Sequence, residues 1–186
     1  MAIFIDLIET NGAGAVESPI VTTGGGNFNI IRPLKFGRAD DPDPNSIVRP
    51  VRGLKKSFEK YVYCKLSGID AGERFSNLQL FTAGPQYSSG VSVDIGLTQA
   101  YEAPVSTDSA VADTSIFLKT ADDPLVLTPE DQEYSSDGNN GSNVLAIGDQ
   151  IGDFLVLQMS VSPRAKPGTL VANYAPVVLV FRYDEA

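Results

Sequence analysis

Three acidic residues lie close enough in the sequence to suggest acid–base chemistry. They are Glu130, Asp131 and Glu133, in the stretch PEDQEY. A pair of carboxylates at a set separation is sufficient to hydrolyse a glycoside, because one acts as acid and the other as base or nucleophile. Nothing in this stretch indicates that any two of them are buried together, and acids clustered in a loop are usually solvated. We therefore expect no catalytic residues and no enzyme activity.

Two loops carry enough oxygen ligands to be considered for calcium. In DDPDPNS, Asp41, Asp43 and Asn45 stand at alternate positions, but the glycine and glutamate that complete an EF-hand loop are missing. The stretch SSDGNNGSN, residues 135–143, is rich in Asn and Gly, which tolerate positive φ. We expect an acidic connector in the first case and a turn in the second, with no metal site in either.

The chain has no histidine and one cysteine, Cys64. The lack of histidine excludes Ser–His–Asp and Cys–His catalysis and removes the commonest zinc ligand. Cys64 lies in YVYCKL, where a small buried hydrophobic residue is expected rather than a reactive thiol. The stretches GAG and GGG lack the spacing of a phosphate-binding loop. No cofactor is expected.

Basic residues are concentrated in one segment, VRPVRGLKKSFEK. It supplies five of the fourteen lysine and arginine residues: Arg49, Arg52, Lys55, Lys56 and Lys60. The whole chain has a net charge of −9, so this segment contrasts with the rest of the protein. Such a contrast can dock a negatively charged neighbour through complementary patches. The alternative is a solvated turn or helix with no partner.

The elements that must position these residues are predicted to be strands. Stretches of strand length and pattern occur at residues 60–67, 77–83, 91–100, 115–120, 124–129, 154–161 and 176–183. Strands do not alternate with long helices, so a parallel α/β sheet is disfavoured. We predict an all-β fold over residues 58–186, an antiparallel β-sandwich or a jelly-roll-like domain.

Residues 1–57 are richer in glycine, proline and small residues, interrupted by apolar clusters at 3–8 and 28–31. We predict an extended N-terminal arm and connector, which packs either on its own body or on a neighbouring subunit. The spacing of apolar residues also predicts a short helix over 54–60. The expected subunit interface combines the apolar clusters with the basic segment: Ile3, Phe4, Ile5, Phe28, Ile30, Arg49, Arg52, Lys55, Lys56 and Lys60.

Length and composition narrow the class of protein further. A chain of 186 residues is long enough for one domain with a substantial core. Its longest apolar run, APVVLVF, is too short for a membrane span. The start, MAIFIDLIET, lacks the basic region of a secretory signal, so none is expected. The negative net charge argues against direct binding of nucleic acid.

Four stretches of the second half resemble small structural proteins of tailed bacteriophages. They are FSNLQLFTAG, GVSVDIGLTQAYEAPV, GDFLVLQMSVSPRAKPG and FRYDEA. The resemblance covers about residues 75–186 and lies in the pattern of strands and turns. It implies a β-sandwich component of the virion that packs against identical copies or against other virion proteins, such as the major capsid protein.

We therefore expect a non-enzymatic structural protein located in the virion. The favoured role is that of a capsid decoration or cement protein that forms a homo-oligomer. The second role considered is that of a neck, tail or baseplate component. The alternative is a carbohydrate-binding β-sandwich that recognises a host surface glycan. Seven tyrosines could stack on sugars in place of the absent tryptophan, although Tyr61, Tyr63 and Tyr183 lie in predicted strands.

Overall fold

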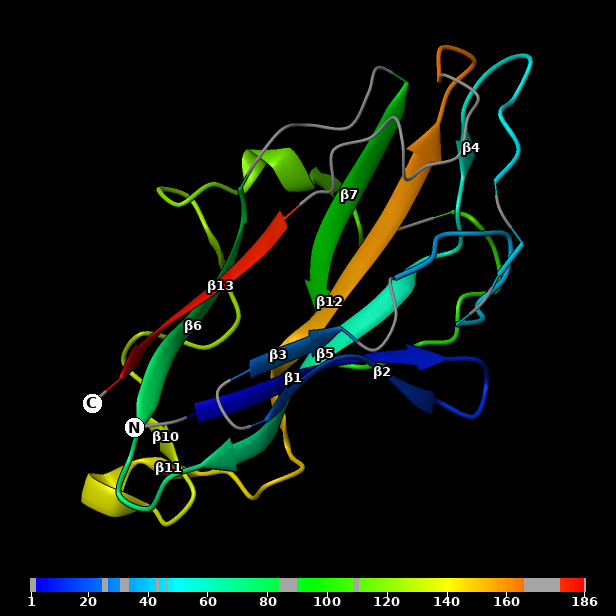
Figure 1. The fold of residues 1–186 in the computed structure, drawn as a ribbon. Helices are drawn as coiled ribbons and strands as arrows, with labels where there is room; N and C mark the ends of the chain where they lie inside the picture. Colours follow the sequence, from blue (N-terminus) through cyan, green and yellow to red (C-terminus); the bar gives the residue numbers. More distant parts are fainter. Residues whose placement is uncertain are drawn as a thin grey trace.

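The computed structural model describes residues 3–24, 27–30, 34–42, 44–45, 47–83, 90–108, 111–165 and 178–185. Over these residues the protein is all-β and almost entirely antiparallel (Figure 1), which confirms the predicted fold class. Helical geometry in the described part is limited to two single 3-10 turns, η1 (Ile116–Leu118) and η2 (Asn139–Gly141). None of these residues forms a helix long and apolar enough to cross a membrane.

Two sheets make up the described structure. The larger sheet has eight strands: β1 (Ile3–Asn11), β2 (Val16–Gly24), β3 (Asn27–Ile30), β4 (Lys55–Lys56), β5 (Lys60–Ile69), β7 (Val91–Thr98), β8 (Thr114–Ser115) and β12 (Gln150–Val161). Their order is β3-β2-β1-β5-β12-β7-β8, and β4 also pairs with β12. The smaller sheet has five strands: β6 (Phe75–Ala83), β9 (Leu125–Val126), β10 (Tyr134–Ser135), β11 (Asn143–Val144) and β13 (Val178–Glu185). Its order is β11-β10-β6-β13, with β9 pairing β6.

The main hydrophobic core lies between the two sheets. Leu66, Val93 and Leu155 enter it from the larger sheet, while Phe75 and Leu80 enter it from the smaller one. All five are almost completely buried. The alternation in the sequence of β7 and β12 predicts this inner face, because successive side chains of a strand point to opposite sides.

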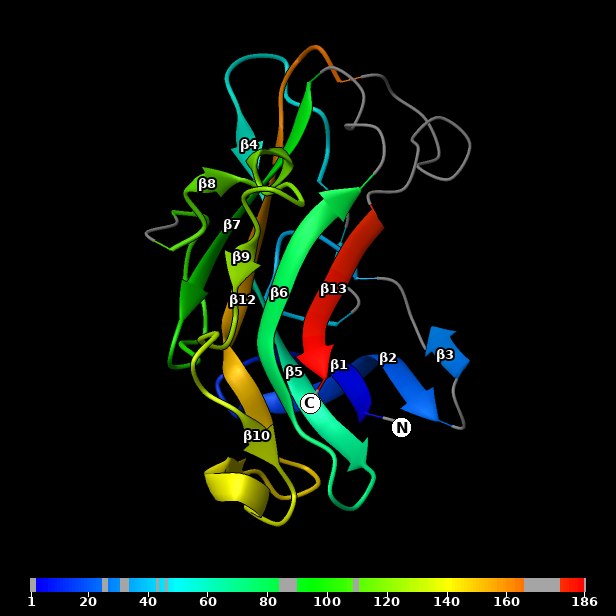
Figure 2. The same cartoon turned by 90° about the vertical axis from the view of Figure 1, so that its left-hand side faces the viewer.

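A second apolar cluster lies apart from the main core. It contains Tyr61, Tyr63, Phe154 and Val156, with Val111 packed against it. Tyr61 and Tyr63 alternate along β5 with the core residues of that strand, so this cluster lies on the other face of the larger sheet. β12 is consequently buried on both faces. Figure 2 shows the path of this strand through the larger sheet.

The N-terminal segment contributes directly to the larger sheet. β1 pairs along β5, from Ile3 opposite Ile69 to Thr10 opposite Tyr61. β1 thus packs on the protein's own body, which is one of the two alternatives predicted for residues 1–57. The sequence does not predict β2, because VESPIVTTG has Pro19 inside it and does not alternate regularly between apolar and polar residues.

The helix expected over residues 54–60 is wrong. Gly53 has a φ of +69°, which breaks any helical run before the segment starts. Lys55 and Lys56 then pair with Val161 and Ser160 at the end of β12. The backbone donors and acceptors of this stretch are thus used in a sheet, and the regular spacing of its apolar residues does not produce a helix.

Candidate functional site: a basic docking surface

A groove lies beside β4, at the end of the larger sheet where β12 finishes. Its volume is about 490 Å³. It is lined by Arg38, Ile47, Leu54, Lys55, Lys56, Phe58, Thr107 and Asp108. The lining thus contains three cations, one carboxylate and three apolar side chains. In the described part of the chain, β4 pairs with the end of β12.

Exposed apolar side chains alternate with cations in the segment that leads into this groove. Val51 is 92% exposed, and Val48 and Leu54 are about two-thirds exposed. Arg49 and Arg52, which lie between them in the sequence, are also exposed. Large apolar residues gathered on a charged surface are typical of sites where another protein docks. We name residues 47–56 together with Arg38 the basic end of the molecule.

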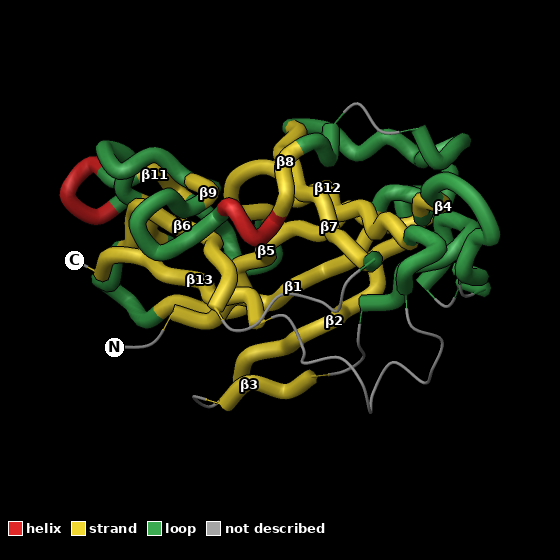
Figure 3. The backbone as a smooth tube through the Cα atoms, turned by 90° about the horizontal axis from the view of Figure 1, so that it is seen from above, coloured by secondary structure: helices red, strands yellow, loops and turns green. Residues whose placement is uncertain are grey.

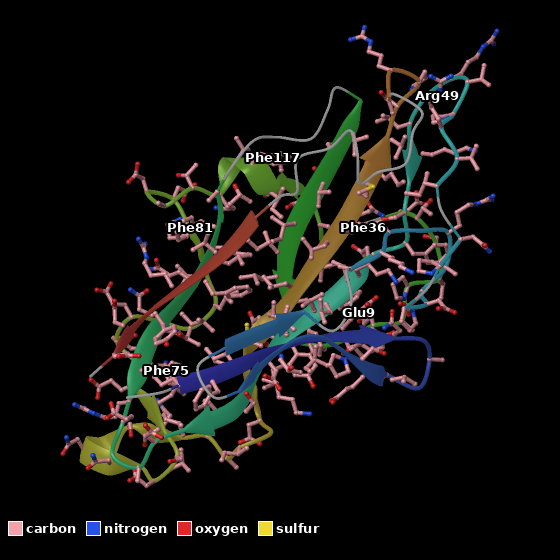
Figure 4. All side chains as sticks on the ribbon, viewed as in Figure 1. Glu9, Phe36, Arg49, Phe75, Phe81 and Phe117 are labelled. Carbon is pink, nitrogen blue, oxygen red and sulfur yellow. The ribbon has the colours of Figure 1, made fainter. Side chains whose placement is uncertain are left out.

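Backbone contacts hold the basic end in place. Ser57 N donates to Met159 O at 2.8 Å, and the Ser57 hydroxyl accepts the Met159 N–H at 3.0 Å. The buried Gln158 amide donates to the carbonyls of Ser57 and Thr107, both at 2.9 Å. Arg49 bonds the carbonyl of Ala165 just beyond β12 (Figure 4). These contacts connect both walls of the groove to the centre of the sheet.

Arg38 reaches the groove from a segment anchored elsewhere. Tyr101 donates its hydroxyl to Asp40 Oδ2 at 2.7 Å, and the same oxygen accepts the Gly12 N–H at 2.6 Å. Burial and the bond to Asp40 raise the pKa of Tyr101, so the hydroxyl keeps its proton. The loop that carries Arg38 is thereby held to the turn between β1 and β2.

Lys60 does not belong to the basic end, which corrects its place in the expected interface. Its side chain is 0% exposed, as is that of Glu9, and the two form an ion pair of 2.9 Å. The Lys60 ammonium also donates to Asn11 Oδ1 at 3.3 Å and to the carbonyl of Asp41 at 2.5 Å. A charge this deeply buried serves the fold and cannot meet a neighbouring subunit.

The apolar residues expected at the interface lie in the larger sheet. Ile3 and Ile5 pack against the protein's own core. Phe4 is half-buried on β1. Phe28 and Ile30 lie in β3, which forms the edge of the larger sheet as far as it is described. Arg49, Arg52, Lys55 and Lys56 lie together at the basic end, and their role at an interface stays a prediction.

The acidic sequences weighed for chemistry are surface loops. Glu130 and Asp131 are exposed, and Glu133 forms an ion pair with Arg74. Residues 135–143 form the expected turn, with positive φ at Gly138, Asn140 and Gly141. Asp43 lies outside the described residues. Within the described ranges, no three acidic or cysteine side chains are grouped so that they could hold a metal ion.

The burial of Cys64 and of two tyrosines tests what the sequence predicts for these residues. Cys64 is buried in the core, as predicted, and burial raises the pKa of its thiol to about 12. Tyr61 and Tyr63 are 3% and 4% exposed, so neither can offer a ring face to a sugar. Sequence reasoning missed Arg38, Ile47, Thr107 and Asp108 as groove residues, because each comes from a loop whose position depends on long-range contacts.

No protein-family model matches the chain, and no curated protein or solved structure is significantly similar to it.

Proposed function

We propose that the protein is a non-enzymatic structural component of a tailed-bacteriophage virion. In this role it acts as a capsid decoration or cement protein that stabilises the particle by packing against neighbouring subunits through its basic end. The proposal is supported by the phage-like pattern of residues 75–186 and by the β-sandwich. The observation that carries it is the grouping of exposed apolar side chains with cations around the groove beside β4.

The chemistry of the basic end is suited to protein docking. Apolar side chains such as Val51 and Leu54 release water when a partner covers them, which supplies affinity. The cations around them select a negatively charged surface and accelerate the encounter.

This function can be tested with purified particles of the phage that encodes the chain. We expect mass spectrometry to find the protein in wild-type particles. Particles carrying Lys55→Glu/Lys56→Glu should contain at least about tenfold less of it, because two repulsive contacts replace two attractive ones. They should also release their DNA at a lower temperature. The control Lys119→Glu/Arg182→Glu changes the net charge equally, away from the basic end, and should incorporate normally.

Two results would count against the proposal. Wild-type particles without the protein would exclude the virion role. Binding of the purified chain to one member of a broad glycan panel would then favour the carbohydrate-binding alternative. Normal incorporation of Lys55→Glu/Lys56→Glu would show that the protein attaches by a surface other than the basic end.

A further inference from the structure

The end of the molecule opposite the basic end is strongly acidic. Glu133 pairs with Arg74, Asn139 bonds the carbonyl of Gly72, and the carbonyl of Asp149 accepts the Leu66 N–H at 2.9 Å. These contacts bring several loops together around the start of β12 (Figures 1 and 3). The exposed acids in and beside these loops are Asp70, Glu130, Asp131, Asp137, Asp149, Asp184 and Glu185. We name this region, residues 70–74, 129–149 and 184–185, the acidic end.

β12 separates the two charged ends along its whole length. It has 12 residues, which at the rise of a β-strand corresponds to about 36 Å between its ends. At physiological ionic strength the Debye length is only about 8 Å. The two ends of one copy therefore do not neutralise each other, and each remains available to an opposite charge on another molecule.

The acidic end also carries exposed apolar side chains. Val144 is 63% exposed and Ile147 is 64% exposed. They lie within the same loops as Asp137 and Asp149. The basic end has the same composition with opposite charge, since Val51 and Leu54 stand beside Arg52 and Lys55. The two ends are thus complementary in charge and alike in their apolar content, as the two sides of a protein interface are.

Shape agrees with this complementarity. Residues 129–132 form a turn in which Gln132 N donates to Pro129 O, and all four residues are exposed. The turn presents Glu130 and Asp131 at a convex corner. The basic end offers a concave groove lined by Arg38, Lys55 and Lys56.

We propose that copies of the protein associate head to tail, with the acidic turn of residues 129–133 of one copy seated in the groove of the next. Side-by-side contact is opposed by the net charge of −9, whereas end-to-end contact joins opposite charges. Such a heterologous contact produces a closed ring if the rotation between copies closes, and an open filament if it does not. The inference rests on the proposed function, since it names the neighbour that the basic end meets.

Sedimentation velocity of the purified full-length protein tests this contact. In about 50 mM salt we expect the wild type to form species larger than a monomer as concentration rises, and about 0.5 M salt should weaken the association because it screens exposed charges. Lys55→Glu/Lys56→Glu and Glu130→Lys/Asp131→Lys should each weaken it at least about tenfold. Glu102→Lys/Asp113→Lys adds the same positive charge at two other exposed sites and should associate like the wild type.

Mixing the two charge-reversed variants gives the decisive result. Each has one reversed end, so a reversed groove in one copy meets a reversed turn in the other, and association between unlike copies should return. Circular dichroism verifies that both variants are folded. A wild type that stays monomeric in low salt, or a folded pair that does not recover on mixing, would overturn the head-to-tail contact. Incorporation into particles would still test the proposed function separately.

Discussion

The buried ion pair between Lys60 and Glu9 fastens the first strand to the centre of the larger sheet. Glu9 lies on β1 and Lys60 begins β5, and both side chains are fully buried. Such a pair adds little net stability when intact, because removing two charges from water offsets their attraction. Removing one partner is different, since the remaining charge stays buried without its counter-ion.

Breaking this pair should therefore destabilise the protein strongly. Lys60→Met is expected to lower the free energy of unfolding by about 3–5 kcal/mol, because Glu9 then keeps a buried charge. Adding Glu9→Leu to that variant should recover part of the loss, although Asn11 and the carbonyl of Asp41 still lack their donor. Urea denaturation of the two single variants and the double variant measures this. A loss below about 1 kcal/mol in both singles would contradict it.

Residue types alone predict the burial of Cys64 correctly, but they wrongly place Lys60 on the surface. Cys64 sits in an apolar strand sequence, and its burial follows from its immediate neighbours. Lys60 sits beside four other cations in sequence, so local composition places it on the surface. Its true partner, Glu9, is 51 positions earlier in the chain, and no local pattern links the two.

At the scale of elements, β7 needs a glycine at position 96 because a loop lies directly on the strand there. A Cβ on Gly96 would collide with the carbonyl of Val111. Val111 packs against the second cluster, which also contains Tyr61, Phe154 and Val156. The glycine lets this loop lie directly on the strand, so that the outer face of the sheet is covered.

Gly96→Ala should move that loop away and expose the second cluster. Overpacking at such a contact costs about 1–3 kcal/mol of unfolding free energy. Gly14→Ala is the matched control, because its nearest neighbour would be Val16 Cγ2 at 3.8 Å and its φ is not positive. The control should stay within about 0.5 kcal/mol of the wild type in urea denaturation. Equal stabilities of the two variants would show that the loop yields without cost.

Alternating sequences predicted the positions of β5, β6, β7, β12 and β13 to within a few residues. In β12 the pattern placed Leu155, Leu157 and Met159 on a dry face, which agrees with the structure. It did not predict that Phe154 and Val156 on the other face are buried too. That burial depends on a loop 40 or more residues earlier in the chain, and strand periodicity does not include such contacts.

For the whole molecule, buried and half-buried tyrosines contribute to a loss of stability at high pH, as does the buried thiol of Cys64. Burial first, and nearby Glu59 second, raise the pKa of Tyr61 to about 12. The pKa values of Tyr63, Tyr101, Tyr134 and Tyr183 are also raised, mainly by burial. In the unfolded chain a tyrosine loses its proton near about pH 10. Above that pH the folded state binds more protons than the unfolded state, so stability falls as pH rises.

The tyrosines should thus make no pH-dependent contribution to the unfolding free energy below about pH 10, and between about pH 10 and 12 stability should decline. Urea midpoints measured across this range, together with tyrosinate absorbance of the native protein, provide the measurement. Native and unfolded protein that titrate with the same midpoint would contradict the burial of these hydroxyls.

The fold class and the basic segment followed from the sequence, but the acidic end did not. The basic segment is visible as a run of residues, whereas the acidic end collects loops separated by more than a hundred residues. The pairing of β6 with β10 and β13 brings them together, along with the ion pair of Arg74 with Glu133 and the bond of Asn139 to Gly72. The groove is equally hidden, since Arg38, Lys55 and Thr107 meet through tertiary contacts.

The path of β12 has a mechanical consequence for a chain of copies joined at their ends. Tension applied between the acidic and basic ends acts along the strand, while its hydrogen bonds to β5 and β7 run across it. The bonds of both ladders are then loaded in shear and must fail together rather than one after another. The sandwich would resist stretching along this axis better than peeling from its edge.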